Sequence, residues 1–110
     1  MNDQKLLELA ARAAGVKGVW QEWWDDLTDS KSCGIAPNGA CGGDWWNPLE
    51  DDGKALRLAI RLGICIVFME ECDSVVAEHS AHGVMIVEAM DDYGTRRSIV
   101  RAAAEIGSRP

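Results

Sequence analysis

The chain has 110 residues, a formal charge of -7 and 47% hydrophobic residues. This length predicts a single domain, 1–110, with a core of modest stability. No apolar run reaches the roughly 20 residues that a membrane-spanning helix needs. The first residues carry acids and no cleavage-site pattern, so we expect no signal peptide and a cytoplasmic location.

The negative charge is concentrated in one stretch of the chain. Eight acids and only one base lie between residues 22 and 52, whereas bases gather near 54–61 and 96–101. A net negative charge disfavours non-specific binding to nucleic acid, so we do not expect this protein to bind nucleic acid directly. The acidic stretch could instead contact a basic surface of a partner.

The N-terminal part of the chain predicts a helix followed by a strand. Residues 3–14 are amphipathic, with Asn2 or Asp3 as the cap and Gly15 as the stop. Residues 19–24 are β-branched and aromatic, which favours a strand. Alternation along that strand places Trp20, Glu22 and Trp24 on one face.

Glycine and proline turn signals fill the next stretch, 25–47, which we expect to be a long, variable, acidic and tryptophan-rich loop. A second helix is predicted over about 51–62, after the break at Pro48 and with Asp51 or Asp52 as its cap. Its expected core face consists of Ala55, Leu56, Ala59 and Ile60.

Two further strands are predicted at 64–71 and 84–90, both apolar on their alternating faces. Such strands are usually covered on both sides. We expect a loop at 72–83 between them. The last helix is predicted to begin near 91–95 and to end at about Ile106, before Gly107.

The predicted order is therefore α-β-loop-α-β-β-α. Strands that are apolar on both faces imply helices on both sides of a sheet. We expect an α/β (α+β) fold, a small three-layer α/β/α sandwich with three helices around a three- or four-stranded mixed or antiparallel sheet.

Two runs carry a resemblance to a known family: WNPLEDDGKALRLAIRLGI, at 46–64, and RRSIVRAAAEIG, at 96–107. Together with the N-terminal LLELAARAAG helix, they resemble the phage ABA sandwich domain, a family of small phage and prophage proteins. The resemblance does not extend to residues 25–43 or 72–83. It implies the fold and a phage or prophage origin, and it implies no reaction.

The sequence contains no recognisable catalytic motif and only a weak candidate set of metal ligands. The sequence has no GxSxG, P-loop, HExxH or GxGxxG pattern, so we expect no enzyme activity and no cofactor. Cys33, Cys41, His79 and His82 could in principle form a metal site. However, HxxH is common by chance and no CxxC pair is present, so we expect no metal.

The tryptophans carry the remaining functional signal. All five lie within residues 20–46, inside the acidic stretch. We expect at least two in the core, with Trp46 packed against the start of the second helix. Adjacent residues of an extended chain point to opposite faces, so one member of each Trp-Trp pair should be exposed. The candidate partner-binding residues are Trp23, Trp24, Asp25, Asp26, Asp44 and Trp45.

Exposed tryptophans surrounded by acids are typical of interface hot spots. The first functional hypothesis is therefore a phage or prophage accessory protein that binds a host protein. It could act as an anti-CRISPR-like inhibitor of a nucleic-acid-binding defence complex. The alternative is a structural or self-associating phage domain, either a homodimer or an assembly component.

Overall fold

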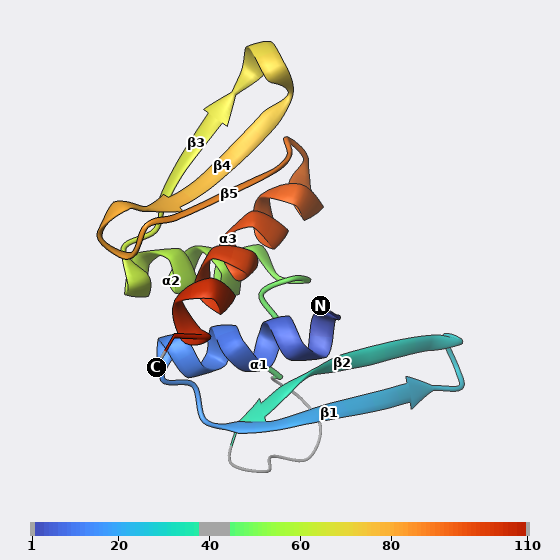
Figure 1. The fold of residues 1–110 in the computed structure, drawn as a ribbon. Coiled ribbons are helices and arrows are strands. Elements are labelled where there is room, and N and C mark those ends of the chain that lie inside the picture. The colour runs from blue at the N-terminus through green and yellow to red at the C-terminus, as the bar shows by residue number, and fades with distance from the viewer. Residues whose placement is uncertain (1, 38–44, 110) are drawn as a thin grey trace.

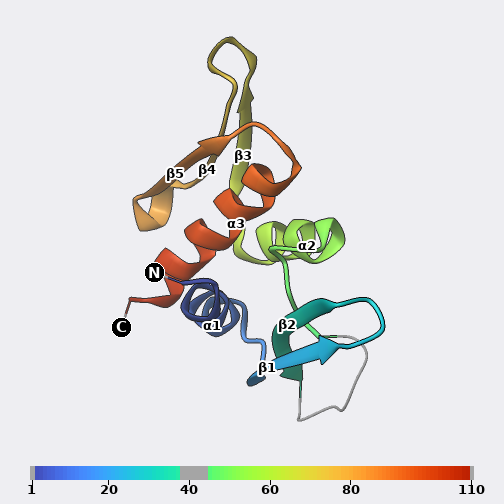
Figure 2. The same cartoon turned by 90° about the vertical axis from the view of Figure 1, so that its right-hand side faces the viewer.

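A computed structural model describes residues 2–37 and 45–109 of the chain. Across these residues the protein has three helices and five antiparallel strands in two sheets, with two short 3-10 turns. The predicted α+β class, with three helices and antiparallel strands, is confirmed. The sheet arrangement differs from the expected single sheet, because the helices lie between two separate sheets (Figures 1 and 2).

The three helices closely match their predicted ranges: α1 (Asp3–Ala14), α2 (Asp52–Leu62) and α3 (Asp92–Gly107). Each begins at a side chain that accepts a hydrogen bond from a free N–H of the first turn. These caps are Asn2, Asp51 and Asp91. Helices α1 and α2 end at Gly15 and Gly63, whose φ angles of 73° and 71° suit glycine.

The first sheet is a hairpin of β1 (Gly18–Asp25) and β2 (Ser30–Pro37). The prediction that 25–47 is irregular was therefore wrong over 30–37. Strand β2 reads SKSCGIAP, which has few β-branched or aromatic residues, and its stability comes from its partners on both sides.

The second sheet has the order β3-β4-β5, formed by β3 (Cys65–Met69), β4 (Ser74–His79) and β5 (Val84–Ala89). Its central strand β4 lies in the stretch 72–83 that we predicted to be a loop. The strand was missed because short 3-10 turns at 70–72 and 80–82 flank it on both sides. Each turn ends at a residue with positive φ, Asp73 or Gly83, and reverses the chain without a typical hairpin signal.

The core lies where α1 crosses α3 and where α3 packs beneath β4 and β5. Its fully buried members include Leu7, Val75 and Val100. In α2 the buried face is formed by Ala55, Leu58 and Ala59. The predicted core positions Leu56 and Ile60 are 55% and 71% exposed. That prediction was wrong because apolar residues occupy two adjacent stripes of this helix, and the structure buries the other stripe.

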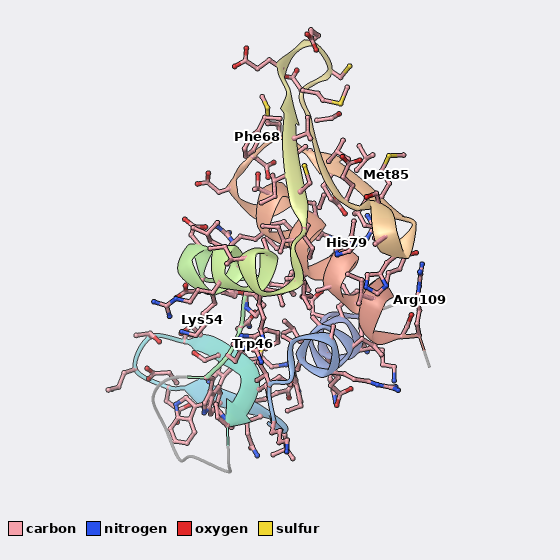
Figure 3. All side chains as sticks on the ribbon, turned by 90° about the vertical axis from the view of Figure 1, so that its left-hand side faces the viewer. Trp46, Lys54, Phe68, His79, Met85 and Arg109 are labelled. Atoms are coloured by element: carbon pink, nitrogen blue, oxygen red, sulfur yellow. The ribbon has the colours of Figure 1, made fainter. Side chains whose placement is uncertain are left out.

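Only one face of the second sheet is covered by helices among the described residues. The register places Ile66, Ala77 and Ile86 in one row on the helix side. Val67, Val76 and Val87 form the matching row on the outer face, where Val67 and Val87 are exposed. The two faces are marked in Figure 3 by Phe68 and Met85, which point to opposite sides.

Candidate partner-binding hairpin

The β1–β2 hairpin begins beneath the helices and extends beyond them at its turn (Figure 1). Its register is continuous from Gly18 opposite Pro37 to Asp25 opposite Ser30. At the base, Ile35 is buried and Trp20 is half-buried against the core. The base therefore anchors the hairpin, and the part beyond it is free to meet a partner.

The turn at the far end is stabilised by its own side chains. Asp25 Oδ1 accepts a hydrogen bond from the Leu27 N–H at 2.9 Å. The hydroxyls of Thr28 and Ser30 lie 2.6 Å apart, and Asp29 adopts a positive φ of 50°, a conformation that Asp tolerates better than most residues. These local contacts give the tip a defined shape without help from the core.

Trp23 and Trp24 lie just before this turn and are 63% and 54% exposed. Their side chains point to opposite faces of the ribbon, because they are neighbours in a strand. We expected one residue of this pair to be covered, but both are exposed. The reason is that the hairpin extends past the helices, so neither of its faces is covered there.

One ion pair crosses the hairpin. Lys31 Nζ lies 3.0 Å from Glu22 Oε1, on the same face as Trp24. The hydrogen bond from Lys31 lowers the pKa of Glu22. Both side chains are about half exposed, so the pair contributes little to stability. It does neutralise the only base of the hairpin, which leaves Asp25, Asp26 and Asp29 as its unbalanced charges.

The segment 45–49 fixes the hairpin to α2. Trp46 N–H donates to Ile35 C=O at 2.8 Å and its carbonyl accepts from Ile35 N–H at 2.9 Å. Asn47 is buried and satisfied: Nδ2 donates to Cys33 C=O at 2.8 Å and Oδ1 accepts from Leu49 N–H at 3.1 Å. Trp46 also packs against the core (Figure 3). The WNPL run therefore holds the hairpin against the rest of the fold and is not an exposed surface.

Four of the six predicted binding residues are neighbours at the end of the hairpin. Trp23, Trp24, Asp25 and Asp26 lie together at the far half of the hairpin. Trp45 is half-buried beside β2, where it helps to line a polar groove of about 300 Å³ with Lys31, Cys33 and Glu50. Asp44 lies outside the described residues. The structure thus places four of the six at one site.

Leu27 is a surface residue that the sequence reasoning missed. It is 97% exposed at the tip of the turn, between Asp26 and Asp29. The sequence does contain a signal for it: Leu27 is the only apolar residue in the run DDLTD, at 25–29. A polar turn of this kind forms without an apolar side chain, so the leucine could have been predicted as an exposed contact residue. Leu27 and the two exposed tryptophans together give the far half of the hairpin three apolar contact groups.

The cysteine and histidine set considered for metal binding is divided. His79 ends β4 and His82 lies in the 3-10 turn that follows, with ring centroids 4.6 Å apart, while Cys33 is in the first sheet. Cys41 lies outside the described residues. Within the described ranges, no group of three His, Cys, Asp or Glu could hold a metal ion. Burial raises the pKa of the Cys33 thiol, which disfavours a reactive thiolate there.

Comparison with family models, curated proteins and solved structures finds no match to this chain. The resemblance to the phage ABA sandwich domain therefore stays a prediction. Over residues 2–37 and 45–109, no helix is both long enough and apolar enough to cross a membrane.

Proposed function

We propose that this protein is a non-enzymatic binding domain whose β1–β2 hairpin docks on a basic surface of another protein. The observation that carries the proposal is the exposure of both Trp23 and Trp24 at the end of a projecting, acidic hairpin. Tryptophan is the side chain most enriched in interface hot spots. Neither ring contributes to the core, so the fold itself does not explain them.

The charges of the hairpin indicate the chemistry of the partner. Asp25, Asp26 and Asp29 surround the apolar tip, and the one lysine is engaged with Glu22. Such a surface is complementary to a patch of Arg and Lys with an apolar hollow at its centre. Grooves that bind nucleic acid have this character, so the hairpin could compete with nucleic acid for such a groove.

The biological setting rests on the family resemblance. A phage or prophage origin would place the partner in the cytoplasm of the host. In that setting the protein would act as an accessory inhibitor of a host protein, with a nucleic-acid-binding defence complex as the first candidate.

A pull-down from host lysate tests this proposal if variants are compared side by side. The variants are Trp23→Ala with Trp24→Ala, and Asp25→Asn with Asp26→Asn, which retains the Asp25 acceptor of the turn. The control is Met85→Ala, an exposed apolar residue in the other sheet. We expect a basic host protein that the wild type and the control retain and that both hairpin variants lose.

Salt supplies a second criterion. Binding through exposed acids should weaken steeply as the ionic strength rises. The proposal fails if all four proteins retain the same partners, or if none is retained at moderate salt. A retained partner that only the charge variant loses would assign the contact to the acids and not to the tryptophans.

A further inference from the structure

Strand β3 is an open edge with unusual composition. It reads CIVFM, pairs only with β4 among the described residues, and carries no charge, proline or bulge. Natural proteins usually protect an edge strand with one of these features, because unpaired N–H and C=O groups recruit other strands. The opposite edge strand, β5, has such protection: Glu88 points inward and pairs with Arg101 at 2.5 Å.

The surroundings of this edge are apolar as well. Leu56 of α2 is exposed on the helix side, and Phe68 of β3 is 57% exposed. Between α2, α3 and β3 lies a groove of about 430 Å³. Its apolar lining residues are Ala55, Leu56, Ile66, Phe68 and Ile99, and Asp52, Asp92, Thr95 and Arg96 complete it. The exposed apolar groups would be covered if another strand were added beside β3.

We propose that β3 pairs antiparallel with β3 of a second copy, forming a two-fold dimer with a continuous six-stranded sheet. The proposal is independent of the function proposed for the hairpin. The two surfaces lie at opposite ends of the molecule (Figures 1 and 2).

The ladder of the second sheet determines the register of this pairing. Met90 N–H donates to the carbonyl of Asp73, the residue opposite it when the β4–β5 register is extended by one pair. Bonded pairs alternate along an antiparallel ladder, so the odd-numbered residues of β4 bond β5 and the even-numbered residues bond β3. In the β3–β4 register, even-numbered residues of β4 lie opposite odd-numbered residues of β3, as Val76 lies opposite Val67. The odd-numbered residues of β3 therefore bond β4. Ile66 and Phe68 therefore direct their N–H and C=O groups to the open edge.

A two-fold axis through Val67 matches these free groups. Ile66 of one copy then faces Phe68 of the other, and each of the two such pairs can exchange two hydrogen bonds. Every pair across the axis is apolar, since Cys65 meets Met69 and Val67 meets Val67. No like charges oppose one another, so this strand is complementary to itself.

The same register fills the groove. Ile66 and Phe68 share the helix-side face of β3. Phe68 of the second copy therefore lies beside Ile66 and over Leu56 of the first copy. By symmetry each copy covers the apolar surface of the other, which accounts for the exposure of Leu56.

The exposed area is sufficient for a modest dimer. Four exposed side chains contribute: Leu56, Val67, Phe68 and Met69. At about half exposure each, they and the strand edge would bury on the order of 1,000 Å² over both copies, near the lower limit of specific interfaces. A weak dimer is therefore expected, and it would be missed at low concentration.

Cysteine cross-linking tests the register. In a non-bonded antiparallel pair the Cα atoms lie about 4.5 Å apart, within the range that a disulfide accepts. Val67→Cys, with Cys65→Ser and Cys72→Ser to remove the neighbouring thiols, should oxidise readily to a covalent dimer. The matched control is Val87→Cys in the same background, which lies on the same face of the other edge strand. The proposal predicts at least tenfold faster cross-linking at position 67.

Sedimentation of the full chain over a range of concentrations supplies the second measurement. Val67→Lys should raise the dimer dissociation constant at least tenfold, because two lysines would meet at the axis, whereas Val87→Lys should leave it unchanged. Circular dichroism confirms that both variants are folded. A wild type that stays monomeric at millimolar concentration overturns the proposal. If Val67→Lys and Val87→Lys weaken the dimer equally, the proposal is overturned in favour of face-to-face packing of the two sheets. If neither does and only Trp24→Ala weakens the dimer, the proposal is overturned in favour of a dimer formed through the hairpin.

Discussion

The backbone of Gly107 in α3 lies directly against the carbonyl group of Leu9 in α1. A Cβ atom at position 107 would overlap the Leu9 carbonyl oxygen and would come within 3.2 Å of Ala13 N. This glycine, together with the buried alanines of both helices, allows the two axes to approach closely. The crossing of α1 and α3 is the most extensive contact between helices in the described structure.

Gly107→Ala should therefore destabilise the protein by about 1–3 kcal/mol, the usual cost of overpacking, although alanine has the higher helix propensity. Urea unfolding followed by circular dichroism measures the change. Gly53→Ala is the matched control: it lies in the first turn of α2, where the nearest neighbour is the Asp51 side chain at 3.3 Å. We expect the control to change stability by less than about 1 kcal/mol. Equal effects at both positions would contradict the close-crossing explanation.

Asn47 is a second position where a small change should have a large effect. Asn47→Ala leaves the Cys33 carbonyl and the Leu49 N–H without their side-chain partner in a buried setting. The expected loss is about 2–3 kcal/mol, because both the hydrogen bonds and the desolvation of the partners count. Ser32→Ala, an exposed position of β2, is the control and should be nearly neutral. The prediction is contradicted if the two variants unfold at the same urea concentration.

The helices could be predicted because their signals are local. Asn2, Asp51, Asp91 and the glycines that follow α1 and α2 mark five of the six helix ends in the sequence itself; the C-terminal end of α3 has no such signal, because Gly107 lies inside the helix. Strand β2 was missed because it has few β-branched or aromatic residues, and β4 was missed because the 3-10 turns on either side reverse the chain without a typical hairpin signal. The helical phase of α2 was ambiguous for a different reason: Leu56 and Leu58 are equally apolar, and only the position of α3 determines which one is buried.

Arg96 joins α3 to the start of α2. Its Nε donates to the Leu49 carbonyl and its guanidinium meets Asp52, both at 2.7 Å. Arg96→Ala should cost about 1–3 kcal/mol, mostly through the partly buried carbonyl, because Asp52 is well exposed. Urea unfolding in low and high salt separates the two contributions, and we expect most of the loss to persist in high salt. Arg57→Ala, on the exposed face of α2, is the control. A loss that disappears in salt would assign the effect to the ion pair alone.

Asp51 gives the stability a defined pH dependence. The Lys54 N–H, which donates to its Oδ1 at 2.9 Å, holds the pKa of this carboxyl below its ordinary value of 3.8. The folded state therefore favours the charged form, and this contribution is fully present above pH 3.8. It is lost as the pH falls through the lower pKa of the folded state.

Asp51→Asn isolates this effect, since asparagine caps a helix about as well as aspartate but does not titrate. Near neutral pH the two proteins should have similar melting temperatures. Below pH 3.8 the wild type should lose stability relative to the variant. Thermal unfolding across the acid range measures the difference. A constant difference at all pH values would show that the Asp51 charge is not coupled to folding.

The candidate site was predicted only in part, for a physical reason. Composition located the tryptophans and acids, and alternation gave the face of each ring. Whether a ring is covered depends on how far the hairpin extends past the helices, which no local pattern of the sequence records. The sequence did predict that Trp46 packs inward, as it does, but it did not predict that both Trp23 and Trp24 are exposed.

This difference between Trp24 and Trp46 gives the final prediction. Trp46→Ala should cost about 3 kcal/mol, because the ring packs against the core and its loss leaves a void. Trp23→Ala and Trp24→Ala should each change stability by less than about 1 kcal/mol, since their rings are mostly in solvent. Urea unfolding of the three variants provides the comparison. If Trp23→Ala or Trp24→Ala destabilised the protein as much as Trp46→Ala, those rings would have a structural role. The case for the hairpin as a binding surface would then lose its main support.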